Sequence, residues 1–354
     1  MPRQIPLTDR LARTVMRLLS SLPVGAQRRI GGKPIQIDGQ TLAPEIQMGL
    51  RLLALVPGSE FTRLPLEKAR RQVDSEAAVF GGDVPVATVA DFELPTRSGR
   101  VAARRYANVP QQETTGTVVY FHGGGWVVGG LESTDSACRF LAKHSTLEVI
   151  SVAYRLAPEH PFPAGLEDAI DAYRWARKVR PGVPVAVAGD SAGGNLSAAV
   201  CLATIDDPIG TPDFQLLYCP CTDLSTKAPS YELFGEGFFL TEEQMDWYKA
   251  HYLRTPEAAL DPLASPLLAD AGTFAKLPPA HVAVSGFDVL RDEGIAYAER
   301  LREAGVPVTL QIVESAIHAF INITGVSRMS ARAFQDSIDS LERGLSGRDR
   351  AISD

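Results

Sequence analysis

The sequence has no long hydrophobic run. None of its apolar stretches reaches the roughly 18 residues that a membrane-spanning helix needs. Arginines interrupt the apolar positions near its start, so the uninterrupted apolar segment of a secretory signal is missing as well. Hydrophobic residues fill 45% of the 354 positions, an ordinary share for a globular protein. We therefore expect no stable insertion into a membrane, and a chain of this length suits one large domain or a domain with an insertion.

The protein is also poor in cysteine and in positive charge. Its four cysteines show no spacing that is convincing as a metal site or a disulfide framework: Cys138, Cys201, Cys219 and Cys221. The chain has 35 basic and 42 acidic residues, which gives a net charge of −7. It therefore has no excess of positive charge with which to bind a nucleic acid. We expect reduced thiols, a cytoplasmic protein, no metal ion and no nucleic-acid partner.

The first 80 or so residues show no strand pattern. Apolar spacing, with proline and glycine near the ends, predicts helices over residues 10–21, 44–56 and 66–79. On the first of these helices the apolar residues share one face: Leu11, Val15, Leu18 and Leu22. Such a face more often packs on its own protein, and the alternative is that this arginine-rich helix makes peripheral contact with a membrane surface.

After residue 80 the pattern changes to strands. Residues 86–94 and 101–106 flank a turn-rich link and predict an antiparallel hairpin. Apolar strands then alternate with helices, at residues 117–121, 147–153, 183–188, 214–218, 280–285 and 307–313. Such strands predict a parallel sheet covered on both faces, with ligands bound beyond the carboxyl ends of the strands. The alternation stops between about residues 220 and 280, which indicates an insertion.

Gly189-Asp-Ser-Ala-Gly193 lies at the junction of a predicted strand and a predicted helix. This is the context of a nucleophile elbow, in which a sharp turn projects the serine hydroxyl away from the sheet. The outer glycines are required because a Cβ at either position would strike the neighbouring strand or helix. The motif also arises by chance, so Ser191 is a strong candidate nucleophile only if a base and an acid accompany it.

The base is expected after the nucleophile in the chain, where three histidines remain. His251 lies within a predicted helix of the insertion, and His281 begins a strand, at the wrong end of the sheet. His318 follows the strand that ends near residue 313, in a short loop at the same sheet edge as Ser191. This position and the chain order favour His318 as the general base.

A carboxylate between the serine and the histidine is needed to orient the imidazole. Asp288 directly follows the strand that ends at Gly286, and it is the preferred candidate. Asp292 and Glu293 are its rivals, but they lie at the predicted start of the next helix, where carboxylates commonly serve as caps.

Three consecutive glycines, residues 123–125, follow the strand that ends at residue 121, and we name them the glycine strip. Glycines leave backbone N–H groups unobstructed, and here they would form an oxyanion hole together with the residue after the nucleophile. We expect the donors to be the N–H groups of Gly123, Gly124 and Ala192. The alternatives are a flexible loop or a phosphate cradle, and the latter lacks both a lysine and the G-x-G-x-x-G spacing.

Together these stretches resemble the hormone-sensitive-lipase-like family of the α/β-hydrolases. The resemblance covers roughly residues 85–345 and rests on four motifs: His122-Gly-Gly-Gly125, Tyr154-Arg-Leu-Ala-Pro-Glu-His-Pro161, Gly189-Asp-Ser-Ala-Gly193 and Asp288-Val-Leu-Arg-Asp-Glu-Gly294. It implies an α/β-hydrolase fold, with a mostly parallel eight-stranded twisted sheet, helices on both faces and a helical cap. One departure is Ala319, since the family usually has glycine after the catalytic histidine.

The resemblance also implies a carboxylesterase or lipase that acts on short- to medium-chain acyl esters without a metal or an organic cofactor. Its triad would be Ser191, Asp288 and His318. The cap would combine residues 1–80 with an insertion at 220–275, residues 81–219 and 276–346 would form the hydrolase core, and residues 347–354 a polar tail. The segment 154–161 would brace the loops beneath the glycine strip.

Several functional details stay open at this point. An amidase or peptidase would use the same triad, and plant gibberellin receptors share the fold without the histidine, so a non-catalytic receptor is the less favoured alternative. Trp126, Phe238 and Phe239 either line an acyl pocket beneath the cap or form the core of the cap, and no acyl chain length follows from them. An edge strand near residues 308–313 and the last helix could support a homodimer.

Overall fold

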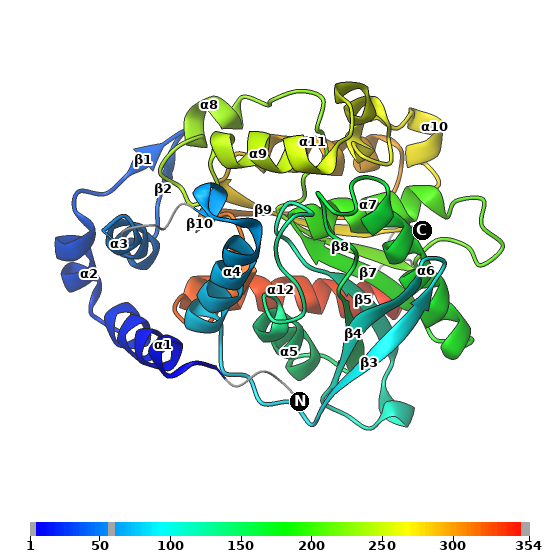
Figure 1. Ribbon diagram of the computed structural model, residues 1–354, viewed down its shortest axis with the longest axis horizontal. Helices are drawn as coiled ribbons and strands as arrows, with labels where there is room; N and C mark the ends of the chain where they lie inside the picture. Colours follow the sequence, from blue (N-terminus) through cyan, green and yellow to red (C-terminus); the bar gives the residue numbers. More distant parts are fainter. Residues whose placement is uncertain (1–4, 56–60, 348–354) are drawn as a thin grey trace.

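An eight-stranded sheet forms the centre of the computed structural model, which describes residues 5–55 and 61–347 (Figure 1). The strands lie in the order β10-β9-β8-β7-β5-β6-β4-β3. Neighbours from β10 to β6 are parallel, whereas β4 is antiparallel to both β6 and β3. The strand bounds are β3 Thr88–Thr96, β4 Gly99–Ala107, β5 Gly116–Phe121, β6 Leu147–Val152, β7 Val185–Asp190, β8 Phe214–Tyr218, β9 Ala280–Phe287 and β10 Val308–Ile317.

Helices cover both faces of this sheet. α5 and α12 lie on one face, where Phe140 of α5 stacks on Phe334 of α12, and α6, α7 and α11 lie on the other (Figure 1). The core helices are α5 Asp135–Lys143, α6 Ala164–Val179, α7 Ala192–Ala203, α11 Arg291–Glu303 and α12 Arg328–Leu345. This architecture confirms the predicted α/β-hydrolase fold.

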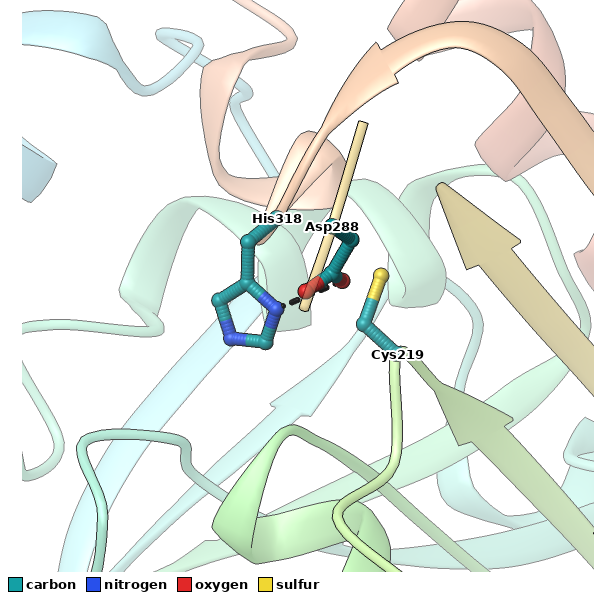
Figure 2. A group of neighbouring side chains, drawn as sticks. All are labelled: Cys219, Asp288 and His318. Atoms are coloured by element: carbon teal, nitrogen blue, oxygen red, sulfur yellow. Dashed lines mark hydrogen bonds and ion pairs between the residues drawn. The ribbon is translucent and has the colours of Figure 1, made fainter. Parts of the chain in front are cut away.

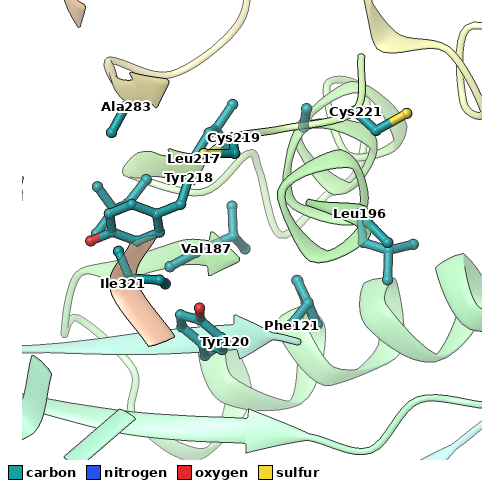
Figure 3. Close-up of a cluster of buried hydrophobic side chains, with 14 of the residues drawn as sticks. Tyr120, Phe121, Val187, Leu196, Leu217, Tyr218, Cys219, Cys221, Ala283 and Ile321 are labelled. Carbon is teal, nitrogen blue, oxygen red and sulfur yellow. The ribbon is translucent and has the colours of Figure 1, made fainter. Parts of the chain in front are cut away.

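The central strands are buried along their whole length. Every residue of β5, β6, β7, β8 and β9 is buried, as expected for strands that are covered on both faces. Figure 3 shows part of this buried cluster, with Val187 of β7, Leu217 of β8 and Leu196 of α7 among its members. This rigid centre holds the carboxyl ends of the strands in fixed positions.

Two segments outside the sheet meet above the carboxyl ends of its strands. The first runs through α1 Leu7–Ser20, α2 Val24–Gly31, α3 Pro44–Leu53, the short helix η1 Phe61–Arg63 and α4 Leu66–Phe80, and the second through α8 Ser230–Phe234, α9 Glu242–Tyr252, η3 Pro256–Leu260, η4 Pro266–Leu268 and α10 Ala271–Phe274. The aromatic ring of Phe61 contacts those of Trp247 and Tyr248, at 6.0 and 5.8 Å between centroids. The N-terminal segment and the insertion are therefore joined by an apolar contact.

The structure corrects three local expectations. A two-stranded ribbon, β1 Gln36–Ile37 and β2 Gln40–Thr41, lies in the segment where no strand was predicted. Strand β10 continues past residue 313 to Ile317 through an irregular register, because its polar residues Glu314 and Ser315 occupy an edge strand rather than a loop. The short helices η2 Gln111–Glu113 and η5 Phe320–Ile323 complete the chain.

The apolar face of α1 is the third correction. It was expected to pack on the protein, but Leu11, Val15 and Leu18 are exposed to solvent. No helix within residues 5–55 and 61–347 is both long enough and apolar enough to cross a bilayer. The end of the helix predicted over 44–56 and, except for residue 347, the polar tail at 347–354 fall outside the described residues.

Candidate active site

Ser191 occupies a sharp turn between β7 and α7. Its backbone has φ 56° and ψ −118°, a conformation that non-glycine residues adopt at a cost of about 1–3 kcal/mol. Two hydrogen bonds hold the turn, from the Ser191 N–H to the Tyr218 carbonyl at 2.8 Å and from the Asn195 N–H to the Ser191 carbonyl at 3.0 Å. A Cβ on Gly189 would overlap the backbone of Gly193, so the close approach of strand and helix requires glycine there.

Asp288 and His318 follow the carboxyl ends of the adjacent strands β9 and β10. The imidazole Nδ1 and the Asp288 Oδ2 are 2.8 Å apart and form a hydrogen bond (Figure 2). The Leu290 N–H donates to the other carboxylate oxygen of Asp288 at 3.0 Å. Both side chains are buried, with Asp288 1% and His318 5% exposed, so the carboxylate can fix the orientation of the ring.

Ser191 lies at the same edge of the sheet as this pair. β7, β8, β9 and β10 are successive neighbours, and the chain leaves β7, β9 and β10 at Ser191, Asp288 and His318. Among the described residues, the Ser191 hydroxyl has no hydrogen bond to the imidazole. Bonds of this kind commonly tighten only in the complex with substrate, so the arrangement suits a nucleophile and its base.

The rival residues have other partners. Asp292 pairs with the Arg291 guanidinium at 2.7 Å, and Glu293 accepts a hydrogen bond from the Thr222 N–H at 2.6 Å. His251 contacts the carbonyl of the preceding helical turn, and His281 Nε2 lies 3.0 Å from the Gln311 amide oxygen. The structure brings none of these side chains to the His318 imidazole or the Asp288 carboxylate.

The backbone N–H groups of the glycine strip differ in whether they already have a hydrogen-bond partner. The Gly123 N–H is already engaged, because it donates to Asp190 Oδ1 at 3.2 Å. The N–H groups of Gly124 and Gly125 have no partner among the described residues, and the Ala192 N–H opens α7. Gly124 and Gly125 have φ values of 107° and 57°, which strain side chains other than glycine. Among the described residues, the N–H groups of Gly124 and Gly125 are therefore free to donate to a ligand atom in the structure as it stands.

Asp190 ties together three segments of the site, a role that sequence reasoning missed. Its buried carboxylate accepts hydrogen bonds from the Tyr120 hydroxyl at 2.7 Å, the Gly123 N–H at 3.2 Å and the Asn322 amide at 3.1 Å. These donors belong to β5, the glycine strip and the short helix after His318. Burial raises the pKa of Asp190, and the Tyr120 hydrogen bond opposes that shift. The only sequence signal was an acidic residue within the elbow motif.

The segment 154–161 braces the glycine strip, as the resemblance implied. The Tyr154 hydroxyl donates to the His122 carbonyl at 2.8 Å, and the two rings stack at 4.2 Å. Burial lowers the pKa of His122 to about 4, so this histidine is neutral at physiological pH. Arg70 of α4 donates to the Val127 carbonyl at 2.9 Å and forms a bidentate pair with Glu159. An N-terminal helix thus helps to position the loop.

Cys219 lies behind the acid and completes a cluster with Asp288 and His318 (Figure 2). One potential ligand atom from each residue lies within 4.8 Å of the others, so the geometry alone could hold a metal ion. Burial and the Asp288 carboxylate raise the pKa of the Cys219 thiol well above its ordinary value, which disfavours the thiolate that a metal requires. We interpret the cluster as a hydrogen-bonding environment for Asp288.

The three predicted pocket residues have different surroundings. Trp126 is 1% exposed and stacks on Tyr252 of α9 at 4.1 Å, and Phe238 packs against Phe287 at 5.3 Å. Phe239 is 41% exposed. Trp126 and Phe238 therefore pack in a core between the insertion and the sheet, which favours a core role for these two residues over an acyl pocket. A cavity of about 270 Å³ lies elsewhere, between α2, α3 and the end of β10.

Comparison with known proteins identifies the family. A family model described as the alpha/beta hydrolase fold matches residues 118–322, more than half of the chain. The chain is 38% identical over 347 residues to the carboxylic ester hydrolase LipN of Mycobacterium tuberculosis, covering 94% of this chain and 91% of LipN. It is 32% identical over 293 residues to the ethyl acetate hydrolase of Pseudomonas putida, covering 80% of this chain and 91% of that enzyme.

A solved structure supports the same conclusion. The hyperthermophilic esterase from Pyrobaculum calidifontis superposes with a TM-score of 0.78 at 35% identity, covering 85% of this chain and 99% of that one. The chain therefore belongs to the hormone-sensitive-lipase-like family of the α/β-hydrolases. It is an enzyme of the carboxylic ester hydrolase class.

Proposed function

We propose that the protein is a serine carboxylesterase that cleaves short- to medium-chain acyl esters through an acyl-enzyme. The observation that carries this proposal is the buried Asp288–His318 hydrogen bond at the sheet edge where the strained Ser191 turn also lies. The ethyl acetate hydrolase among the relatives supports a short acyl group. Four free, buried cysteines are consistent with a cytoplasmic site of action.

Two half-reactions share one base. Ser191 Oγ attacks the acyl carbon while His318 Nε2 takes its proton, and Asp288 stabilises the imidazolium that results. The oxyanion accepts hydrogen bonds from the Gly124, Gly125 and Ala192 N–H groups, and the loss of one such donor typically costs about 2.7–4 kcal/mol of transition-state stabilisation. His318 then protonates the departing alcohol. Water, deprotonated by His318, attacks the acyl-enzyme and releases the carboxylic acid and free Ser191.

Ser191→Ala tests the nucleophile. We expect kcat for a chromogenic acetyl ester to fall by about 10⁴- to 10⁶-fold, with unchanged thermal unfolding. Ser197→Ala in the same helix is the matched control, because Ser197 donates to the Gly193 carbonyl within α7 and should leave kcat within a few-fold. A fluorophosphonate should label the wild type at Ser191 and leave Ser191→Ala unlabelled. Full activity of Ser191→Ala would refute the assignment.

Substrate class needs a separate measurement. An amidase or peptidase would use the same three residues, so the ratio of kcat/KM for an acetyl ester to that for the matched anilide decides between the two reactions. We expect the ester to be strongly preferred. A series of esters from acetyl to palmitoyl should peak at the short to medium lengths, and a maximum at palmitoyl would contradict that part of the proposal.

A further inference from the structure

Helix α1 presents its apolar face to solvent. Leu7, Leu11, Val15 and Leu18 follow one another at intervals of four, four and three residues, so they form one stripe along the helix. Their side chains are 72%, 61%, 53% and 64% exposed, and no residue of α1 is buried. A surface helix ordinarily turns such a stripe toward the core. Helix α1 itself lies at the periphery of the molecule, away from the sheet (Figure 1).

The opposite face of α1 makes the contact with the protein. α1 packs on α4, and the Arg13 guanidinium donates to the Ala78 carbonyl at 2.6 Å. The helix is therefore held through its polar side, and the exposure of the stripe follows from that anchor. A contiguous exposed apolar stripe is a common feature of interaction sites.

The charge around the stripe indicates the chemistry of the partner. α1 and α2 together carry five arginines and one aspartate, whereas the whole chain has a net charge of −7: Arg10, Arg13, Arg17, Arg28 and Arg29, with Asp9. On a helix of 3.6 residues per turn, Arg10 and Arg17 lie along one edge of the stripe. Because Arg13 is turned toward α4, the positive charges of α1 that accompany its exposed leucines are those of Arg10 and Arg17.

We propose that α1 docks on an anionic phospholipid surface. Its four apolar side chains would enter the boundary between headgroups and acyl chains while the flanking arginines contact lipid phosphates. A second copy of the chain fits the patch less well, because a two-fold contact would place the same arginines of both copies against each other. This inference does not depend on the proposed ester substrate.

Vesicle sedimentation tests the proposal on the full-length protein. We expect the wild type to sediment with vesicles of 70% phosphatidylcholine and 30% phosphatidylglycerol, and to do so much less with pure phosphatidylcholine. The double variant Leu11→Ser and Leu18→Ser should lower the partition coefficient at least about tenfold, since each buried leucine contributes more than a factor of ten. Leu260→Ser is the matched control, because Leu260 is also 64% exposed but lies in η3.

A charge variant provides an independent measurement. Arg10→Gln with Arg17→Gln should weaken binding to the anionic vesicles about tenfold or more, because each arginine near such a surface contributes about a factor of five. All variants should hydrolyse a soluble short ester at the wild-type rate, which shows that they are folded.

Three results would overturn the proposal. The first is a wild type that sediments with neither kind of vesicle. The second is equal binding to both compositions, which would exclude a role for the arginines. The third is a dimer by light scattering that becomes a monomer when Leu11 and Leu18 are replaced by serine, because the stripe would then be a contact between copies of the chain.

Discussion

Helices α1 and α12 both carry an apolar stripe, but they turn it in opposite directions. In α12, Phe334, Ile338 and Leu341 are 0% exposed and lie under the sheet. In α1 the corresponding positions, such as Leu11 and Leu18, are more than 60% exposed. The two helices would be described in the same words from their sequences, yet one is part of the core and the other forms an outer surface.

The difference lies in what each helix meets. α12 packs against β8, β9 and β10, where a broad apolar surface is available. α1 rests on α4 through Arg13, so its polar side is the inner one. Apolar periodicity identifies a helix and its apolar face, but the partner of that face comes from elsewhere in the chain. Single residues can be compared in the same way, by pairing a buried residue with a more exposed one. Three such pairs can be tested.

The first pair compares Asp288 with Asp292, and the expected difference, in kcat, is the largest of the three. Asp288→Asn should lower kcat for a short ester by about 10⁴-fold, because the amide cannot hold the His318 tautomer or stabilise the imidazolium. Asp292→Asn should change kcat less than about threefold, since Asp292 pairs with Arg291 at the start of α11. Steady-state kinetics of both variants, with thermal unfolding as the check on folding, make the measurement. Equal losses in the two variants would place the acid elsewhere.

The second pair compares α12 and α1 directly. Ile338→Ala removes a fully buried side chain from the core and should lower the free energy of unfolding by about 2–5 kcal/mol. Leu18→Ala truncates a side chain that is 64% exposed, and the change should stay within about 0.5 kcal/mol. Urea unfolding at pH 7 measures both. A large loss for Leu18→Ala would show that the α1 stripe is covered within the protein itself.

Much of the candidate site was predicted from where its residues lie in the chain, because the carboxyl ends of parallel strands meet at the same edge of a sheet. That rule selected Asp288 and His318, which are 30 residues apart in the chain and 2.8 Å apart in the structure. The turn at Ser191 was predicted separately, from the motif at residues 189–193, and its positive φ and the close contact between Gly189 and Gly193 follow from a strand that leads directly into a helix.

The same rule does not predict which partner a particular N–H group or side chain contacts. Nothing local to Gly123 indicates that its N–H donates to Asp190, because that bond joins the ends of two strands 67 residues apart. Trp126 could equally have lined a pocket, and only its stacking on Tyr252 of the insertion places it in a core. Ala319 has a left-handed backbone, with φ 60°. This conformation explains why glycine is usual at this position, because alanine is less suited to it.

The third pair compares the buried His281 with the exposed His160, and the expected difference, in the free energy of unfolding, is the smallest of the three. Burial lowers the pKa of His281 to about 4, from an ordinary value near 6.5. Below pH 6.5 the unfolded chain therefore binds a proton at this residue and the folded chain does not, so stability is lost as the pH falls from about 6.5 to about 4. Asp190 acts in the opposite sense through its raised pKa, but it is common to all variants and cancels in a comparison between them.

His281→Gln should remove this pH dependence while keeping a partner for Gln311. Between pH 7 and pH 5 the wild type should lose about 2 kcal/mol more of its free energy of unfolding than the variant, because each unit of pH below 6.5 is worth about 1.36 kcal/mol. Urea unfolding at the two pH values gives the difference, and His160→Gln should follow the wild type. If His281→Gln also follows the wild type, the buried ring is taking up a proton in the folded state, and burial at this end of the sheet does not exclude charge.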